Sequence, residues 1–139
     1  MRKYIRQSPD PTVGITIFGA GSQDFYVIRY ADVLLMRAEA MVETGDVNGA
    51  IDLVNQVRAR AYGDNSHDFD TSEGTLLEAI YTERRKELGG EGHGFFDLVR
   101  TGRAASMIEG FTPNKNEVFP IPLEEIQFSQ GNWTQNTGY

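Results

Sequence analysis

Two apolar stretches at helical spacing are separated by only two residues, Gly45 and Asp46. Steps of three and four residues place each apolar set on one helix face, which predicts helices over residues 28–44 and 47–61. Gly45 suits the left-handed residue that ends a helix, and Asp46 suits the cap that begins the next. A connection this short forces the helices into an antiparallel hairpin. The apolar positions are Ile28, Ala31, Leu34, Leu35, Ala38, Met41 and Val42, then Val47, Ala50, Ile51, Val54, Val57 and Ala61.

The predicted hairpin over residues 28–61 resembles one tetratricopeptide unit. Residues 45–50 match the turn of that repeat and the small residue of its second helix, although the aromatic residue that the repeat favours near Leu34 is missing. No tandem repeat follows. Two helices alone cannot bury their apolar faces, so the pair must dock on another element.

The rest of the chain predicts two more helices and two irregular ends. A third helix is expected over residues 73–88, capped by Thr71 or Ser72, and a fourth over residues 92–102. Residues 1–27 are expected to be irregular, with a short strand at 13–18. After Gly110 we expect an extended segment at 119–122 and a helical turn at 123–126. These patterns predict an all-α unit over residues 28–139 that ends in an extended, loop-rich tail.

Composition excludes several classes of protein. The 139 residues carry a net charge of −7, which argues against a nucleic-acid binder because such proteins need a basic face. The absence of cysteine excludes disulfides, thiolate zinc sites and a lipid anchor on this chain. The first residues carry positive charge but no apolar segment, so they do not form a secretory signal.

The densest polar cluster lies on the third and fourth predicted helices. Arg84 and Glu87 fall on the apolar stripe of the third helix, where a charge without a partner would cost several kcal/mol or more. We therefore predict a buried structural network that locks these two helices together. Its expected members are Arg84, Glu87, Glu91, His93, Asp97 and Arg100.

Two catalytic interpretations of this cluster are weaker. Glu83, Glu87 and Glu91 recur every four residues and could supply a carboxylate pair for glycoside hydrolysis, but such spacing is common on solvated helix faces. Glu91, His93 and Asp97 could bind a metal, but the chain has only 2 histidines and no zinc-protease motif. We expect no metal, no cofactor and no catalysis.

Aromatic residues in polar loops are the candidates for binding a sugar. An aromatic ring can bury the apolar face of a pyranose. Most of the aromatic residues are expected to pack in the core or under loops. The three expected to be exposed are Tyr62, Phe69 and Trp133.

An ordered set of motifs resembles the C-terminal part of the SusD/RagB family. No single motif decides this, but their order and spacing over residues 28–139 are specific. The motifs are RYADVLLM at 29–36, AEA at 38–40, NQVRARA at 55–61, ERRKEL at 83–88, EGH at 91–93, FDL at 96–98, FPIP at 119–122, QN at 135–136 and GY at 138–139.

This resemblance implies a role that composition could not show. Family members are non-catalytic lipoproteins on the surface of the outer membrane in Bacteroidetes-type bacteria. They have a helical, tetratricopeptide-like scaffold, capture glycans or in some branches peptides, and deliver them to a SusC-like TonB-dependent transporter. The resemblance therefore implies a glycan or oligosaccharide as ligand and this transporter as partner.

The chain departs from the family pattern in length and at a few positions. Family members are several times longer and begin with a signal peptide and a lipidated cysteine, so we expect a C-terminal fragment with some tendency to self-associate. Gly90 and Gly94 stand where the family often has bulky residues, and Phe95 stands where it has Trp. Trp133 and Thr137 replace the usual Leu and Pro. The alternative function is a small helical module that binds a protein partner.

Overall fold

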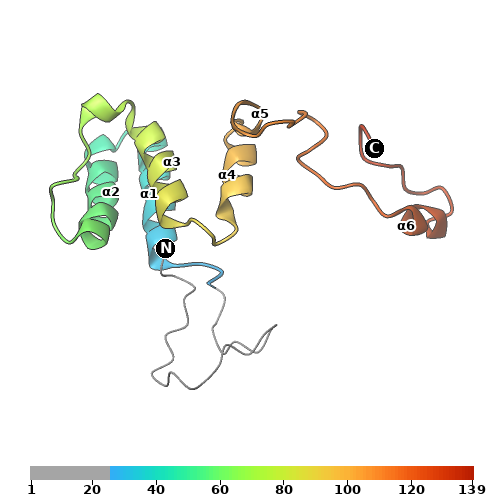
Figure 1. Ribbon diagram of the computed structural model, residues 1–139, viewed down its shortest axis with the longest axis horizontal. Coiled ribbons are helices and arrows are strands. Elements are labelled where there is room, and N and C mark those ends of the chain that lie inside the picture. Colours follow the sequence, from blue (N-terminus) through green and yellow to red (C-terminus); the bar gives the residue numbers. More distant parts are fainter. Residues whose placement is uncertain (1–25) are drawn as a thin grey trace, which may run out of the picture.

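A computed structural model of the protein describes residues 26–139 (Figure 1). The strand predicted at 13–18 lies outside these residues, as does nearly all of the irregular segment predicted at 1–27. Within residues 26–139 the chain forms helices and no strand, which confirms the all-α prediction. The elements are α1 (Tyr30–Thr44), α2 (Val47–Tyr62), the 3-10 turn η1 (Thr71–Glu73), α3 (Leu76–Glu87), α4 (His93–Arg100), α5 (Ala104–Met107) and α6 (Leu123–Phe128).

The hairpin predicted from the apolar stripes is present as α1 and α2. Gly45 has a φ of 89°, in the left-handed region that favours glycine, and the Asp46 N–H donates to the Met41 carbonyl over 2.8 Å. The Asp46 side chain then accepts a hydrogen bond from the Gly49 N–H at the start of α2. One residue therefore closes α1 and the next opens α2, which turns the chain back on itself.

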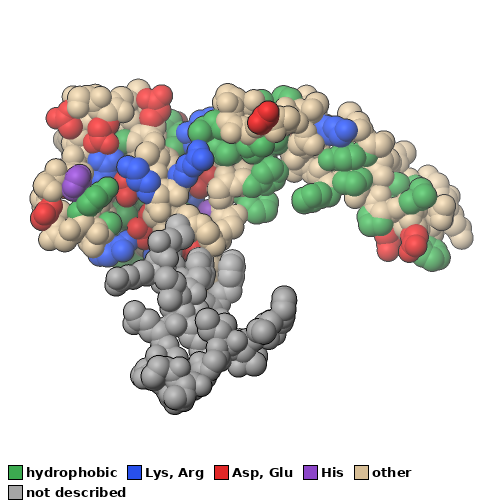
Figure 2. All heavy atoms as spheres, viewed as in Figure 1, with side chains coloured by type: hydrophobic (Ala, Val, Ile, Leu, Met, Phe, Trp, Pro, Cys, Tyr) green, Lys and Arg blue, Asp and Glu red, His purple; other side chains and the backbone are tan. Residues whose placement is uncertain are grey.

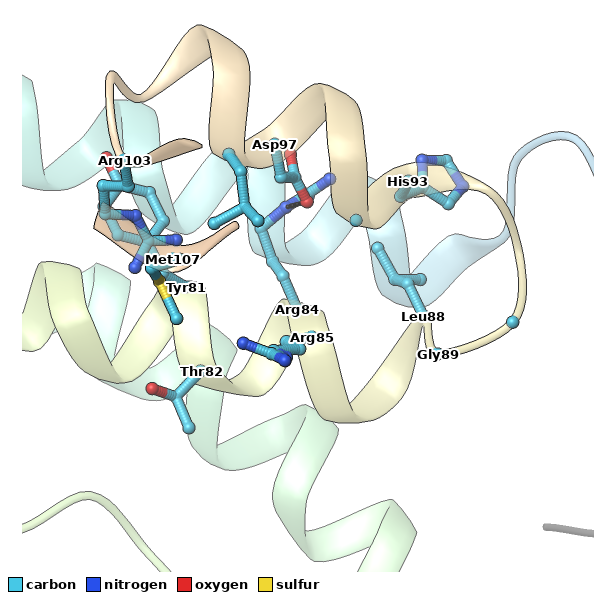
Figure 3. A pocket seen from close by; sticks show the side chains of 13 residues that line it. Tyr81, Thr82, Arg84, Arg85, Leu88, Gly89, His93, Asp97, Arg103 and Met107 are labelled. Atoms are coloured by element: carbon cyan, nitrogen blue, oxygen red, sulfur yellow. Dashed lines mark hydrogen bonds and ion pairs between the residues drawn. The ribbon is translucent and has the colours of Figure 1, made fainter. Parts of the chain in front are cut away.

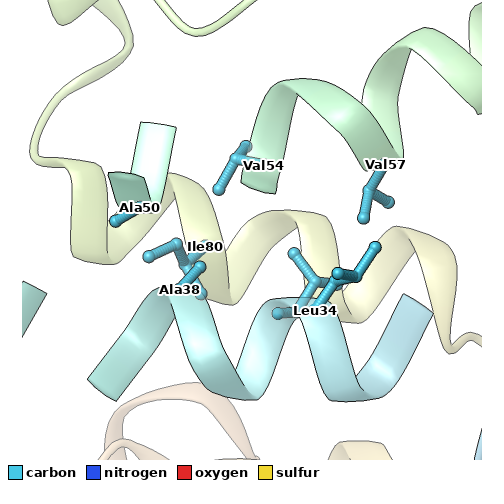
Figure 4. Close-up of a cluster of buried hydrophobic side chains, with 7 residues drawn as sticks. Leu34, Ala38, Ala50, Val54, Val57 and Ile80 are labelled. Atoms are coloured by element: carbon cyan, nitrogen blue, oxygen red, sulfur yellow. The ribbon is translucent and has the colours of Figure 1, made fainter. Parts of the chain in front are cut away.

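A third helix covers the face that the hairpin leaves open. Leu35 of α1, Val54 of α2 and Ile80 of α3 are all fully buried and meet in one cluster (Figure 4). Ala38 and Ala50 are also fully buried, and such small side chains let α1 and α2 approach closely. The element on which the predicted hairpin had to dock is therefore α3.

The start of the third helix was predicted wrongly. The sequence placed its cap at Thr71 or Ser72, whereas those residues belong to η1 and α3 begins at Leu76. Gly74 has a φ of 106° and separates the two elements. Thr75 is the cap of α3: its hydroxyl accepts from the Glu78 N–H over 3.3 Å, and the Glu78 carboxylate accepts from the Thr75 N–H over 3.1 Å.

The fourth helix is shorter than predicted and is followed by an unpredicted turn. Gly102, with a φ of 68°, ends α4 at Arg100, and the single turn α5 follows at once. α5 is too short to produce a readable hydrophobic period. None of the helices within residues 26–139 has both the length and the apolarity of a membrane-spanning segment.

Beyond α5 the chain forms an arm, residues 108–139, that extends away from α1–α3 (Figure 1). Ile121 lies between two prolines, which have no N–H to donate, and the Gln135 side-chain amide bonds both its N–H and its carbonyl over 2.8 Å. Asn136 donates to the Phe119 carbonyl over 2.7 Å. The end of the chain is thus tied to the predicted extended segment, and α6 extends the predicted turn at 123–126 to Phe128.

Candidate functional site

The densest polar cluster is centred on Arg84, whose side chain is only 4% exposed. Its Nη1 donates to an Asp32 oxygen over 2.8 Å, and its Nε donates to an Asp97 oxygen over 2.9 Å. Asp32 lies in the first turn of α1, where a negative charge is favourable to the helix dipole. A single guanidinium from α3 therefore joins α1 to α4.

Arg29, just before α1, holds two of the predicted carboxylates. Its guanidinium lies 2.9 Å from a Glu87 oxygen and 2.8 Å from a Glu91 oxygen, and Arg60 also pairs with Glu87. The hydrogen bond to Glu91 raises the pKa of Arg29 above its ordinary value, while desolvation opposes the rise. Arg29 was not among the predicted members of the cluster, although it begins one of the quoted motifs.

A further buried cluster forms around Arg58 of α2. Its Nε donates to Glu83 over 3.0 Å, and its two Nη atoms donate to the two oxygens of Glu73 over 2.8 and 2.9 Å. Sequence reasoning missed this residue. The signal was available, because Arg58 lies four residues after Val54 on the apolar stripe of α2.

The remaining predicted members differ in their surroundings. Arg100 makes a bidentate pair with Glu39 of α1 over 2.7 and 2.8 Å and also bonds Asp97. The hydrogen bond to Glu39 raises the pKa of Arg100. His93 lies at the start of α4, and within residues 26–139 no hydrogen bond or ion pair joins it to Arg84, Glu87 or the other charged members. His93 instead lines the cavity between α3, α4 and α5 that is described below.

The carboxylates suggested for glycoside hydrolysis do not lie on a solvated helix face. Glu83, Glu87 and Glu91 are 3%, 7% and 3% exposed, and each pairs with an arginine. None of the three lines the cavities described below. A glycosidase needs two carboxylates facing an open site on either side of the scissile bond. This arrangement supports structure rather than catalysis.

No group of three or more His, Asp or Glu side chains within residues 26–139 is arranged to hold a metal ion. The histidine of the metal hypothesis, His93, faces the cavity between α3 and α4. Asp97 is already bonded to two arginines.

The three candidate aromatics lie in separate surroundings. Trp133 is 53% exposed and, with Phe128, lines a cavity of about 370 Å³ on the arm, whose other residues are Glu125, Ser129, Gln130 and Asn132. Tyr62 stacks on His67 with ring centroids 3.8 Å apart and lines a smaller cavity of about 200 Å³. Phe69 is half-buried, lines neither cavity, and its N–H donates to Asn55 over 2.8 Å.

A third and larger cavity, of about 520 Å³, lies between α3, α4 and α5 (Figure 3). Arg84, Arg85 and Arg103 contribute the positive groups of its lining. The Arg103 guanidinium lies 4.2 Å from the centre of the Tyr81 ring. Desolvation raises the pKa of the Tyr81 hydroxyl, and the charge of Glu39 contributes in the same direction.

Comparison with known proteins connects this geometry to a family. The model of the SusD family, SusD_RagB, matches residues 1–139. The chain belongs to the SusD family. The resemblance of its ordered motifs to this family is thereby confirmed.

Individual relatives agree with this membership. The chain is 36% identical to SusD-like protein P25 of Formosa agariphila over 120 residues, which are 76% of this chain and 22% of that protein. It is 34% identical to SusD-like protein P38 of the same organism, over 81% of this chain and 23% of that one. The crystal structure of a SusD-like protein from Bacteroides fragilis superposes with a TM-score of 0.67 and 29% identity, over 83% of this chain and 26% of that one. The chain thus spans about a quarter of the length of these relatives.

For this SusD-family chain we predict that the Arg84 pair is essential to stability. Arg84→Met leaves Asp32, which is 3% exposed, without its buried counter-charge, so we expect the free energy of unfolding to fall by about 3–5 kcal/mol. Urea denaturation followed by circular dichroism measures this. Arg37→Met, on the exposed face of α1, is the matched control and should change stability by less than about 0.5 kcal/mol. Equal midpoints for the two variants would contradict a buried network.

Acid sensitivity should depend in part on Glu73. The hydrogen bond from Arg58 is the main cause that lowers the pKa of Glu73 in the folded chain. A lowered folded-state pKa stabilises the fold above the unfolded-state value, and that stability is lost as the pH falls through the folded-state value. Glu73→Gln should therefore flatten the decline in unfolding free energy between about pH 5 and pH 2. Glu43→Gln, at an exposed residue of α1, should retain the decline; an equal effect of both would refute this assignment.

Proposed function

We propose that this chain takes part in capturing a nutrient oligosaccharide at the surface of the bacterial outer membrane, by binding alone and without covalent chemistry. The observation that carries the proposal is the SusD-family match over residues 1–139. It is supported by the burial and pairing of the acids that would otherwise suggest hydrolysis.

The cavity on the arm is the proposed sugar-binding site. The exposed rings of Trp133 and Phe128 can cover the apolar face of a pyranose, and Gln130 and Asn132 carry amides that match sugar hydroxyls. Ser129 prepares the site, because its hydroxyl accepts from the Trp133 N–H over 3.0 Å. The backbone at Trp133 is therefore held before a ligand arrives, which lowers the entropy cost of ordering this loop on binding.

Trp133 is the single tryptophan of the chain, so its fluorescence reports directly on this cavity. Titration with neutral oligosaccharides (maltohexaose, laminarihexaose and xylohexaose) should change the emission for at least one of them. Trp133→Ala should weaken that sugar about tenfold or more, equal to about 1.4 kcal/mol, measured by calorimetry.

The matched control for Trp133 is Phe119→Ala. Phe119 is 84% exposed on the same arm but does not line the cavity, so its loss should leave sugar binding unchanged. If no sugar alters the fluorescence, or if Phe119→Ala weakens binding as much as Trp133→Ala, this assignment of the site is wrong.

We also propose that the captured sugar is handed to a SusC-like TonB-dependent transporter. Figure 2 shows hydrophobic side chains gathered along the arm and at its junction with α4 and α5, and such exposed apolar surface suits a protein partner. Phe128 and Leu123 of the arm are 80% and 67% exposed.

The chain should co-elute with a purified SusC-like transporter in detergent, and Leu123→Ser should reduce the complex. Separate elution would contradict the handover. Co-elution without binding of any sugar would favour the alternative, a helical module that binds only a protein partner.

A further inference from the structure

The cavity between α3, α4 and α5 shares no residue with the arm cavity that contains Trp133. It occupies about 520 Å³ between α3, α4 and α5, within the range of small-molecule sites. Arg103 and His93 lie at opposite ends of the view in Figure 3, with Arg85 between them on α3. The apolar part of the cavity lining includes Leu88, Leu98 and Met107.

The charge of this cavity is unusual for a chain whose net charge is −7. Of its three arginines, Arg84 is neutralised by Asp32 and Asp97. Arg85 and Arg103 form no ion pair with any carboxylate in the part of the chain that the structure describes. Two positive charges of the lining are therefore uncompensated by direct partners.

Arg103 is held in place without using its terminal nitrogens. Its Nε donates to the Thr101 hydroxyl over 3.2 Å, and its guanidinium lies over the ring of Tyr81. The Glu78 carboxylate accepts hydrogen bonds from the backbone N–H and the hydroxyl of Thr75, and these bonds are the main causes that lower the pKa of Glu78. The charge of Arg103 makes a smaller contribution in the same direction. The two Nη atoms of Arg103 thus remain available to a ligand.

The two unpaired arginines both line this cavity. Tyr81, which carries Arg103 above its ring, is four residues before Arg85 on α3, and residues at this spacing are about 5–6 Å apart between Cβ atoms. Both guanidiniums therefore belong to the lining of one cavity, and their planar forks match carboxylate and sulfate oxygens.

Space for the rest of the ligand lies in front of Gly94 of α4. A Cβ built on Gly94 would meet no atom within 4 Å, so the volume in front of it is open. Glycine inside a helix is about 1 kcal/mol less favourable than alanine. A larger side chain at this position would occupy the cavity while improving the helix.

We propose that this cavity binds a sugar that carries a carboxylate or a sulfate group, with the oxyanion held by Arg85 and Arg103 and the ring against Leu98 and Met107. The inference extends the proposed function by assigning the chain an acidic ligand class at a second site. If no acidic sugar binds in this cavity, the proposed binding of neutral sugars at Trp133 is unaffected, because the two cavities share no residue.

The test is an NMR titration of the whole chain with glucuronate, glucose 6-sulfate and glucose. We expect at least one acidic sugar to shift amide signals within residues 81–107, and glucose to shift none of them at the same concentration. Comparison of the two acids shows whether carboxylate or sulfate is preferred. Binding should weaken as salt is raised. Equal binding of glucose, or no binding by either acid, would overturn the proposal.

Variants locate the site. Arg85→Gln and Arg103→Gln should each weaken the acidic sugar about tenfold or more, whereas Arg37→Gln, a matched removal of an exposed arginine from α1, should have no effect. Gly94→Leu should abolish binding without lowering the melting temperature. Unchanged binding in Gly94→Leu, or an equal loss in Arg37→Gln, would refute the site. If Gly94→Leu does not fold, the two arginine variants decide the question.

Discussion

The structure depends on one buried guanidinium. Arg84 lies where α1, α3 and α4 meet. Its hydrogen bonds to Asp32 and Asp97 offset the free-energy cost of removing its charge from water. The apolar core joins α1, α2 and α3, whereas α4 contributes no fully buried side chain. The position of α4, and with it one wall of the cavity between α3, α4 and α5, therefore depends on ionic contacts more than on core packing.

This division explains why the most conspicuous charged residues are not the proposed binding residues. Glu83, Glu87 and Glu91 are committed to arginines inside the fold. The groups available to a ligand lie elsewhere, on Trp133 of the arm and on Arg85 and Arg103 beside α4. Membership of the SusD family fits the helical scaffold that these contacts hold together.

The sequence predicted the parts of the fold that local rules control. The α1–α2 hairpin follows from apolar periodicity and the Gly45–Asp46 junction, and both were readable. The start of α3 was misplaced because Asp70 and Thr75 both make capping boxes, and only the positive φ of Gly74 separates their two elements. The aromatic candidates were named, but the cavity that joins Trp133 to Phe128 depends on how the arm folds.

By itself the sequence determined the α1–α2 hairpin, the presence of α3 and α4, and the need for partners around Arg84 and Glu87, because periodicity and caps act over a few residues. The order of its motifs indicated the family. The sequence predicted Asp97 as a member of this network, but only the tertiary structure identified Asp32 and Arg29 as further partners. Arg29 and Asp32 pair with residues more than 50 positions away, at separations of 62 and 52. Helix spacing cannot encode such contacts, since they arise only when packed helices bring distant charges into the same water-free space.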